Sequence, residues 1–326
     1  MSEVQHSPSP RAPLSTQLLV AAGVFLPFAG LVAAVISVWG WGFTWLDFWL
    51  LVGFYLATAL GITVGFHRLF THRSFETYWP LKALLAILGS MAVQGPLLTW
   101  VAVHRRHHRY SDKPEDPHTP HHSGRGIWGK VRGFVHAHFG WLFHPSEADT
   151  LIYAKDIYAN RTLRWISYLF PLWVALGLIL PGVIGGLVSG SWIGFWRAFL
   201  WGGLARVFLV HHVTWSVNSV CHLWGSQPHT WDDQSRNNLL FGFLALGEGW
   251  HNTHHAFPTS ARHGLRWWEV DLSYWFIRTL SWLGLAWDIK LPSQRTLEKV
   301  AAKRREIKAQ RKQARRRRKS KQEVLH

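Results

Sequence analysis

The sequence predicts an all-α integral membrane protein with four transmembrane helices and a cytoplasmic, histidine-rich helical cap. Four stretches are almost entirely apolar over about 20 residues, the length that a helix needs to cross a hydrocarbon core. The short links within the first and second pairs of these stretches contain no lysine or arginine. The 326 residues include 21 histidines but a single cysteine. These observations point to a helical membrane protein whose polar chemistry depends on imidazole.

The predicted spans cover approximately residues 17–38, 45–66, 166–188 and 192–213. Residues 39–44 and 189–191 lack basic side chains, whereas both ends of the chain and the long middle segment contain many. Because cytoplasmic loops carry the excess of lysine and arginine, both termini and the middle segment are expected in the cytoplasm. Arg197 and Arg206 fall inside the fourth span, so each must face the helix bundle or reach an interface.

A fifth apolar stretch, Leu81–Val103, is interrupted by Gly89, Gly95 and Pro96. Histidines flank it on both sides, and an even number of spans keeps both termini on one side. It is therefore expected to be an interfacial or cap helix, with a fifth span as the alternative.

The two ends of the chain differ from the body between them. Residues 1–15 are polar and rich in serine and proline, and they lack the pattern of a signal peptide, so we expect a disordered N-terminus. Residues 16–292 form the predicted membrane domain. Residues 293–326 form a basic tail, whose segment from Lys303 to Lys321 carries +11 of the net charge of +17. The charge therefore indicates a solvated or membrane-surface tail and not a nucleic-acid-binding face.

Cys221 is the single cysteine of the sequence, so a disulfide framework and cysteine-built metal sites are excluded. Any metal site must therefore use histidine. Three clusters follow one another: His67 with His72, then His104, His107 and His108, then His251, His254 and His255. Offsets of three and four residues return to one face of an α-helix. Neighbouring histidines lie about a hundred degrees apart around a helix of 3.6 residues per turn, so they can point at two different metals.

Two further features complete the predicted site. His67 and His72 are five residues apart and do not share a face of a regular α-helix, so they need separate metals or a frayed helix end. Asn218 and His222 are four apart and can offer an amide and an imidazole together. An all-nitrogen set suits redox-active iron, with zinc and copper also allowed. Acids nearby can orient the rings, but sequence does not pair them; they are Asp112, Glu115, Asp116, Asp232, Asp233 and Glu248.

The remaining histidines divide into two groups. Four are expected to be ordinary surface residues, namely His6, His121, His122 and His326. For eight others, about one in four is expected to support the ligands; they are His118, His136, His138, His144, His211, His212, His229 and His263.

The clusters HRLFTH, HRRHH and HNTHH, with NSVCH preceding the third, resemble the histidine boxes of the membrane fatty acyl desaturases, most nearly the Δ9 acyl-CoA (stearoyl-CoA type) group. The resemblance covers about residues 15–290. It implies a four-span stem under a cytoplasmic cap and two irons held by nine histidines, with Asn218 holding a water near one of them. It also implies an acyl tunnel whose bend is formed by Gln94, Trp100 and Thr214. The nine histidines are His67, His72, His104, His107, His108, His222, His251, His254 and His255.

The resemblance implies O2-dependent insertion of a cis double bond, at the Δ9 position, into a saturated acyl chain. Electrons would come from a separate ferredoxin or b-type cytochrome with its reductase, because the chain contains no nucleotide-binding glycine motif and no cysteine cluster. A bacterial-type cell membrane is expected in preference to the endoplasmic reticulum, with membrane lipid as a partner and no nucleic acid.

The sequence departs from the acyl-CoA group where that group holds the CoA head. Val101-Ala102-Val103 stands in place of a basic and an acidic residue, and Phe143-His144-Pro145 stands in place of a basic pair. An acyl-CoA substrate is still favoured, but acyl carrier protein and phospholipid esters remain alternatives. CoA could instead be held by basic residues elsewhere in the sequence, namely Arg105, Arg106, Arg109, Lys130 and Arg132.

Two rival functions remain open. A membrane hydroxylase of the same chemistry would keep the nine histidines and put oxygen into the product. A metal transporter would need polar groups at mid-membrane, yet the predicted spans carry no histidine or acid near their centres. Desaturation is therefore preferred to both.

Overall fold

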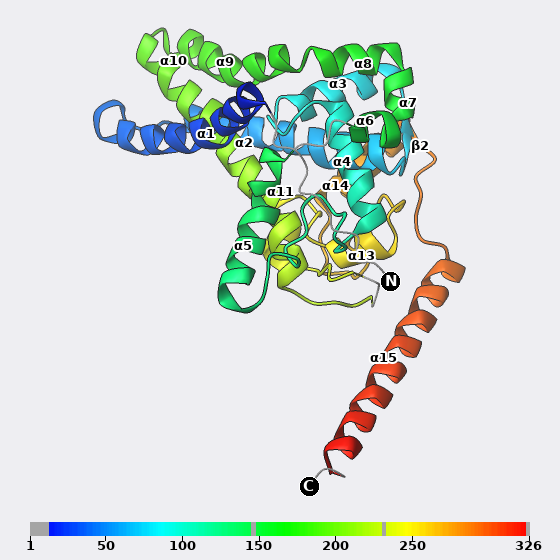
Figure 1. Ribbon diagram of the computed structural model, residues 1–326. Coiled ribbons are helices and arrows are strands. Elements are labelled where there is room, and N and C mark those ends of the chain that lie inside the picture. The colour runs from blue at the N-terminus through cyan, green and yellow to red at the C-terminus, as the bar shows by residue number, and fades with distance from the viewer. Residues whose placement is uncertain (1–12, 145–147, 230–232, 324–326) are drawn as a thin grey trace.

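The computed structural model describes residues 13–144, 148–229 and 233–323, and its helices form two parts (Figure 1). The stem contains four long apolar segments among the described residues. These are α1 (Leu14–Trp41), α2 (Trp45–Leu60) continued by the π-helix η1 (Gly61–Thr71), α9 (Phe170–Ser189), and α10 (Trp192–Ala198) continued by the π-helix η3 (Phe199–Ala205) and α11 (Arg206–Leu223). The other helices form the head, in which the histidines gather.

The bounds of the spans differ from those that hydropathy predicts. The second extends to Thr71 and the fourth to Leu223, so both carry histidines directly from the stem into the head. The third begins at Phe170 and not at 166, because α8 (Arg161–Tyr168) ends first and Pro171 starts a new helix in its first turn. Hydropathy misses the extensions because buried polar side chains interrupt the apolar pattern.

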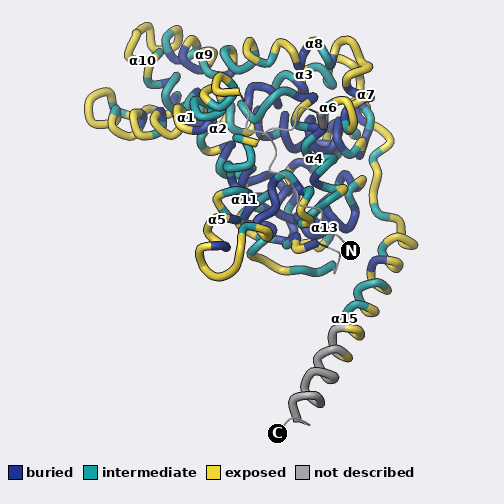
Figure 2. Tube along the Cα trace, viewed as in Figure 1, coloured by how far each residue is buried: buried dark blue, intermediate teal, exposed yellow. Residues whose placement is uncertain are grey.

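The outer faces of the stem are apolar and exposed. Figure 2 shows exposed residues along α1, α9 and α10. The large exposed side chains of these helices include Leu19, Leu187 and Trp192. A soluble surface does not present so large an apolar area, so these faces suit a lipid environment. The stem therefore belongs in a membrane.

The two arginines of the fourth span are both paired within the protein. Arg197 Nε lies 2.6 Å from Asp47 Oδ2, next to the capping box that Thr44 and Asp47 form at the start of α2. Arg206 is fully buried and donates to the carbonyl oxygens of Met91 at 2.8 Å and Gly177 at 2.5 Å. Each charge thus faces the bundle, as the cost of a charge in lipid requires.

The apolar stretch Leu81–Val103 is divided between two helices, α3 (Trp79–Ser90) and α4 (Leu97–Tyr110). The chain turns between them with positive φ at Val93 and Gly95. At 1.5 Å per residue the 12 residues of α3 span about 18 Å, too short for a hydrocarbon core of about 30 Å. The structure therefore agrees with a helix that does not cross the membrane.

The rest of the head consists of short helices around a common core. They are α5 (Gly126–His138), the 3₁₀ turn η2 (Gly140–Phe143), α6 (Ala148–Tyr153), α7 (Lys155–Ala159), α8, α12 (Leu239–Leu244), α13 (His251–Ala256) and α14 (Leu272–Trp282). Among the described residues, β1 (Glu76–Thr77) pairs antiparallel with β2 (Ala286–Trp287). Phe66, Leu85, Val101 and Ile277 are buried in the core that joins η1, α3, α4 and α14.

The basic tail forms a helix, α15 (Gln294–Glu323), which projects from the head (Figure 1). Its first turns are not detached, because Val300 is 5% exposed and packs in one cluster with Ala256 and Phe257 at the end of α13. The sequence favours a disordered tail after residue 292, since it shows only the charge and not this contact. The predicted disordered N-terminus lies mostly outside the described residues.

Candidate metal centre

The first histidine pair lies on a π-helix. The amide of His72 donates to the carbonyl oxygen of His67 at 3.1 Å, a bond that spans five residues. Residues five apart therefore return to the same side of η1, and the two rings are 4.8 Å apart between centroids. His67 and His72 fall in one group, although a regular α-helix would not place them on one face, because η1 has π-helical spacing and His72 follows its last residue.

The second and third clusters each divide between two groups of rings. On α4, His104 and His108 face His67 and His72, whereas His107 faces the other way. On α13, His254 joins the first group, whereas His251 and His255 join His107. Neighbours along a helix thus point at different centres, as the spacing of 3.6 residues per turn predicts.

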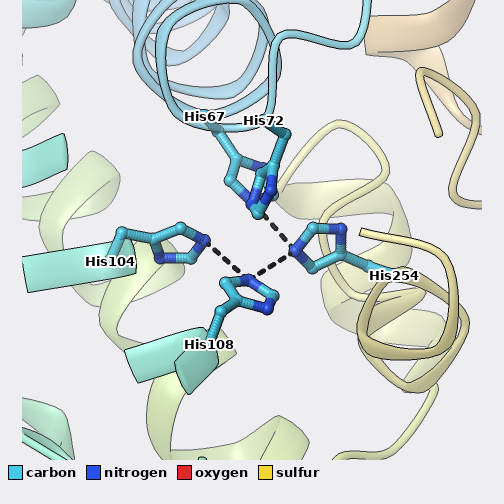
Figure 3. A group of neighbouring side chains, drawn as sticks. All are labelled: His67, His72, His104, His108 and His254. Atoms are coloured by element: carbon cyan, nitrogen blue, oxygen red, sulfur yellow. Dashed lines mark hydrogen bonds between the residues drawn. The ribbon is translucent and has the colours of Figure 1, made fainter. Parts of the chain in front are cut away.

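The larger group contains five histidines from three elements, and their ring nitrogens lie within 4.8 Å of one another. Figure 3 shows the rings converging, with His254 Nε2 3.1 Å from His67 Nε2 and 2.9 Å from His108 Nε2. His104 Nε2 is 3.0 Å from His108 Nε2. The group comprises His67, His72, His104, His108 and His254.

The smaller group contains four histidines from α4, α11 and α13, also within 4.8 Å. His251 Nε2 lies 3.0 Å from His222 Nε2 and 3.1 Å from His255 Nε2, and His107 Nε2 lies 3.3 Å from His255 Nε2. Asn218 precedes His222 by one turn of α11 and lines a cavity that also touches His251. The nine histidines singled out by the sequence are thus together, divided five and four.

Four buried carboxylates bind the outer nitrogens of these rings. Each contact joins an Nδ1 atom to a carboxylate oxygen: His67 to Glu248 at 2.7 Å, His107 to Asp116 at 3.0 Å, His222 to Asp112 at 3.0 Å, and His255 to Asp233 at 2.7 Å. This is the second-shell pattern of metal-binding histidine, in which a carboxylate fixes the ring and its tautomer. Of the other two candidate acids, Asp232 lies outside the described residues, and Glu115 contributes its backbone carbonyl to Arg106 Nε.

Burial would by itself raise the pKa values of these four acids. The neighbouring histidines outweigh it, together with Arg68 beside Glu248, and hold all four pKa values below their ordinary range. The carboxylates are therefore ionised at neutral pH. An ionised carboxylate accepts the Nδ1 proton of its histidine and leaves the Nε2 lone pair facing the centre of the group.

This arrangement fits a metal ion. Burial, reinforced by the other rings, holds the pKa values of five of the histidines well below 6.5, so these rings are neutral; they are His72, His104, His108, His251 and His254. Nε2 atoms that carry lone pairs then face each other, as those of His104 and His108 do at 3.0 Å, without a proton to share. Within the described residues, His72 Nε2 also has no hydrogen-bond partner. A cation coordinated by these nitrogens satisfies them all.

Two of the eight intermediate histidines extend the same networks. His263 Nδ1 lies 3.2 Å from Glu248 Oε2, and His118 Nδ1 lies 3.8 Å from Asp116 Oδ1. Arg68, fully buried, donates to Asp271 Oδ1 at 2.9 Å and lies 3.3 Å from Glu248 Oε1. Sequence spacing gives no signal for these partners, since His263 and Asp271 lie far from His67 along the chain.

A cavity of about 730 Å³ runs beside both groups. Its wall includes His67 and His104 of the larger group and His251 of the smaller one. Trp100 stacks on His104 with centroids 5.0 Å apart, and Gln94 Nε2 donates to Thr214 Oγ1 at 2.9 Å. All three predicted tunnel residues therefore line one cavity at the centre.

The wall of the cavity combines two kinds of side chain. It includes apolar side chains of α1, such as Leu19 and Val20, and it includes Arg106, His136 and His144 of the head. Arg105, a candidate for holding CoA, does not line the described cavity: its guanidinium donates to Asp156 Oδ1 at 2.6 Å and to the carbonyl oxygens of Phe70 and Thr71 at 2.7 and 3.2 Å. It caps the end of η1 and so supports His72.

Comparison with known proteins agrees with this centre. Residues 43–280 match the family model described as fatty acid desaturase. A hex-5-enoyl-(acyl-carrier protein) acetylenase of Moorena producens is 42% identical over 275 residues, which cover 84% of this chain and 86% of that protein. An sn-1 stearoyl-lipid 9-desaturase of Synechocystis is 42% identical over 246 residues, covering 74% of this chain and 71% of that protein. An acyl-CoA C20 Δ5-desaturase of Anemone leveillei is 37% identical over 266 residues, covering 80% and 79%.

The family model matches most of the chain, and the matched residues include all nine histidines and most of the residues that line the cavity. The apolar stem, the buried imidazole groups and these relatives agree with one another. The chain belongs to the fatty acid desaturase family.

Proposed function

We propose that this protein is a membrane di-iron desaturase that introduces a cis double bond at the Δ9 position of a saturated acyl chain, with acyl-CoA as the preferred substrate. The single observation that supports this best is the cavity of about 730 Å³, whose wall contains histidines of both groups. Its size falls within the range of about 300–1,000 Å³ that is usual for ligand pockets. A chain threaded through it passes both groups at close range.

In this proposal the five-histidine and four-histidine groups each hold one iron, and Asn218 holds a water beside the smaller group. Bound iron and O2 supply an oxidant strong enough to remove two hydrogens from adjacent methylenes. The balance is one saturated chain, O2, two electrons and two protons in, and one alkene and two waters out. The electrons come from a separate ferredoxin or b-type cytochrome.

The residues of the chain determine where this chemistry falls. Trp100 is fixed against His104, so its indole forms a rigid wall next to the larger group. The hydrogen bond from Gln94 to Thr214 joins α11 to the turn before α4 on the cavity wall. A chain that bends at these residues is held in one register, and a bent register favours the cis product.

The polar part of the cavity wall in the head supports a substrate with a phosphate-bearing arm. Arg106 is a permanent cation, and His136 and His144 can donate hydrogen bonds to a phosphate or carbonyl oxygen there. Coenzyme A and the phosphopantetheine of acyl carrier protein both carry such an arm, and the relatives named above include acyl-CoA, carrier-protein and lipid enzymes. Residues 16–292 form the desaturase domain of this proposal, with the head and both termini in the cytoplasm of a bacterial-type cell.

The test is expression in a desaturase-deficient host, followed by mass spectrometry of fatty acid methyl esters with localisation of the double bond. Purified iron-loaded protein is then given stearoyl-CoA, stearoyl-carrier protein or stearoyl lipid in separate reactions. A cis-Δ9 alkene formed fastest from stearoyl-CoA supports the proposal in full. If another stearoyl carrier is turned over faster, that carrier and not CoA is the preferred substrate. A hydroxylated product overturns the proposal of desaturation.

A further inference from the structure

A second exposed feature lies beside α13, and its pocket shares no lining residue with the acyl cavity. We call it the Trp–Arg surface and define it as Arg266, Trp267, Trp268, Arg304 and Arg305. Trp267 is 92% exposed and Trp268 37% exposed. The three arginines line one pocket of about 470 Å³, together with Thr253 of α13 and Leu297 of α15. Exposed tryptophan next to arginine is the composition that protein interfaces favour.

The charge of this surface is strongly positive. Glu269 is the acid that lines the described pocket, and it is buried, with Oε2 accepting from the amides of Leu265 at 2.9 Å and Arg266 at 3.0 Å. Burial, together with Arg304 and Arg266, lowers the pKa of His229 in the same pocket to about 4, so His229 adds no charge at neutral pH. The arginine charges therefore face a partner and attract an acidic one.

An aromatic path leads from this surface to the smaller histidine group. Trp268 packs edge-to-face on Trp250, with ring centroids 5.6 Å apart. Trp250 is 1% exposed and directly precedes His251, the first residue of α13. His251 Nε2 in turn lies 3.0 Å from His222 Nε2. The Trp268–Trp250 pair thus leads from a partly exposed ring to the neighbour, along the chain, of His251, which is 2% exposed.

We infer that the Trp–Arg surface docks an acidic one-electron carrier protein, and that Trp268 and Trp250 form the path by which its electron reaches the centre at His251. This inference rests on the proposed function, which needs two electrons from outside for each double bond. Each encounter oxidises one reduced carrier by one electron and reduces the metal centre by one electron. Two encounters complete the requirement, and the two protons come from water.

The position of the surface favours a redox partner over an anionic membrane. Attraction to lipid needs only the charge of the arginines and the exposed indoles. It gives no reason for an indole pair that leads from the surface to the residue directly before His251. The pocket wall also includes Thr253, which lies between His251 and His254 on α13.

The first experiment measures binding. The full-length, iron-loaded protein in detergent is titrated with a plant-type 2Fe–2S ferredoxin, which is acidic, at increasing salt. We expect measurable binding that weakens with salt, and a loss of about tenfold or more in affinity for the double variant Arg266→Glu with Arg304→Glu. The matched control is Arg125→Glu, an exposed arginine at the N-cap of α5, which should bind like the wild type. Equal binding by the double variant and the wild type overturns the docking site.

The second experiment separates docking from electron transfer. Turnover is measured with reduced ferredoxin and, separately, with dithionite-reduced methyl viologen, which needs no docking surface. The double variant should show a raised KM for ferredoxin and an unchanged rate with viologen. Trp268→Leu should lower kcat with ferredoxin at an unchanged KM, and Trp268→Phe should restore much of that rate. A Trp268→Leu variant with the wild-type kcat overturns the path.

A third measurement addresses the membrane as the alternative. Flotation of the protein reconstituted in nanodiscs on phosphatidylglycerol vesicles compares the wild type with the double variant. Loss of vesicle binding with unchanged ferredoxin affinity assigns the surface to lipid and overturns the inference. If the wild type forms no alkene with either reductant, the proposed function fails, while the ferredoxin titration still decides the docking site.

Discussion

The Nδ1 atom of His67 lies 2.7 Å from an oxygen of Glu248, and the same carboxylate contacts Arg68 and His263. Glu248 therefore fixes the tautomer and direction of one proposed ligand from the other half of the chain. Replacing it by glutamine keeps the shape but removes the charge. We expect Glu248→Gln to weaken iron binding by about 10- to 100-fold, measured by competition with a chelator. Glu298→Gln, an exposed substitution on α15, is the control and should bind iron like the wild type.

Two irons per chain are expected in active protein. His254→Ala removes a nitrogen from the larger group and His107→Ala one from the smaller, so each should abolish desaturation and lower the iron content. Both variants should still insert in the membrane, because insertion depends on the apolar stem. Elemental analysis and membrane fractionation measure the two effects, with the exposed His122→Ala as the control. Active protein with one zinc and no iron would contradict the assignment.

Trp100 should determine where the double bond forms. Its indole is stacked on His104 at 5.0 Å and lines the cavity. Truncation of a large aromatic side chain in a packed site typically costs about 3–5 kcal/mol, enough to let the acyl chain take other registers. Trp100→Ala should lose most turnover and yield isomers beyond a single cis-Δ9 alkene, detected by product mass spectrometry. A wild-type rate with one unchanged product would mean that Trp100 is ordinary packing.

The basic tail should be dispensable for the chemistry itself. Removing residues 303–326 takes away no span and no histidine of either group, although it removes attraction of about 1 kcal/mol per basic residue for an anionic leaflet. With methyl viologen as reductant, the truncated protein in detergent should keep its iron and its rate. Loss of bound iron would show that α15 supports α13 more strongly than the contact of Val300 suggests.

The stability that Asp156 contributes to the fold should be lost in acid. Burial would raise its pKa, but hydrogen bonds from Arg105 and Arg73 lower it from 3.8 to about 2. Because the folded pKa is below the unfolded one, the stabilising contribution is fully present above about pH 5 and is lost as pH falls toward 2. The midpoint temperature of thermal unfolding of Asp156→Asn should therefore be lower than that of the wild type at pH 6. The two midpoint temperatures should converge at about pH 2 to 3. An equal difference at both pH values would exclude the ion pair as the cause.

The sequence predicted those parts of the centre that follow local spacing. The residues i, i+3 and i+4 on α4 and α13 have a fixed angular relation, and their division between two groups follows from that relation alone. The stem was also predictable, because apolar runs of sufficient length have few alternatives. Gln94, Trp100 and Thr214 came from the family resemblance, and they line one cavity.

The remaining parts depend on contacts that spacing does not determine. His67 and His72 share a face only because η1 is a π-helix, and neither the composition of Gly61–Thr71 nor its length distinguishes that from an α-helix. Asp112 meets His222 across 110 residues, so its pairing is a property of the fold and not of the local sequence. Arg105 is basic and next to a ligand, yet it caps a neighbouring helix.

The four carboxylates behind the imidazoles also determine how much positive charge the head needs to be neutral. Asp112, Asp116, Asp233 and Glu248 bring four negative charges to a region where the surrounding rings are largely neutral. Two divalent ions bring four positive charges and balance them. Protein that folds before it receives metal must hold these four carboxylate charges against largely neutral rings. Synthesis in iron-poor medium should thus yield a chain that unfolds at a lower temperature and gains stability when it is loaded with metal.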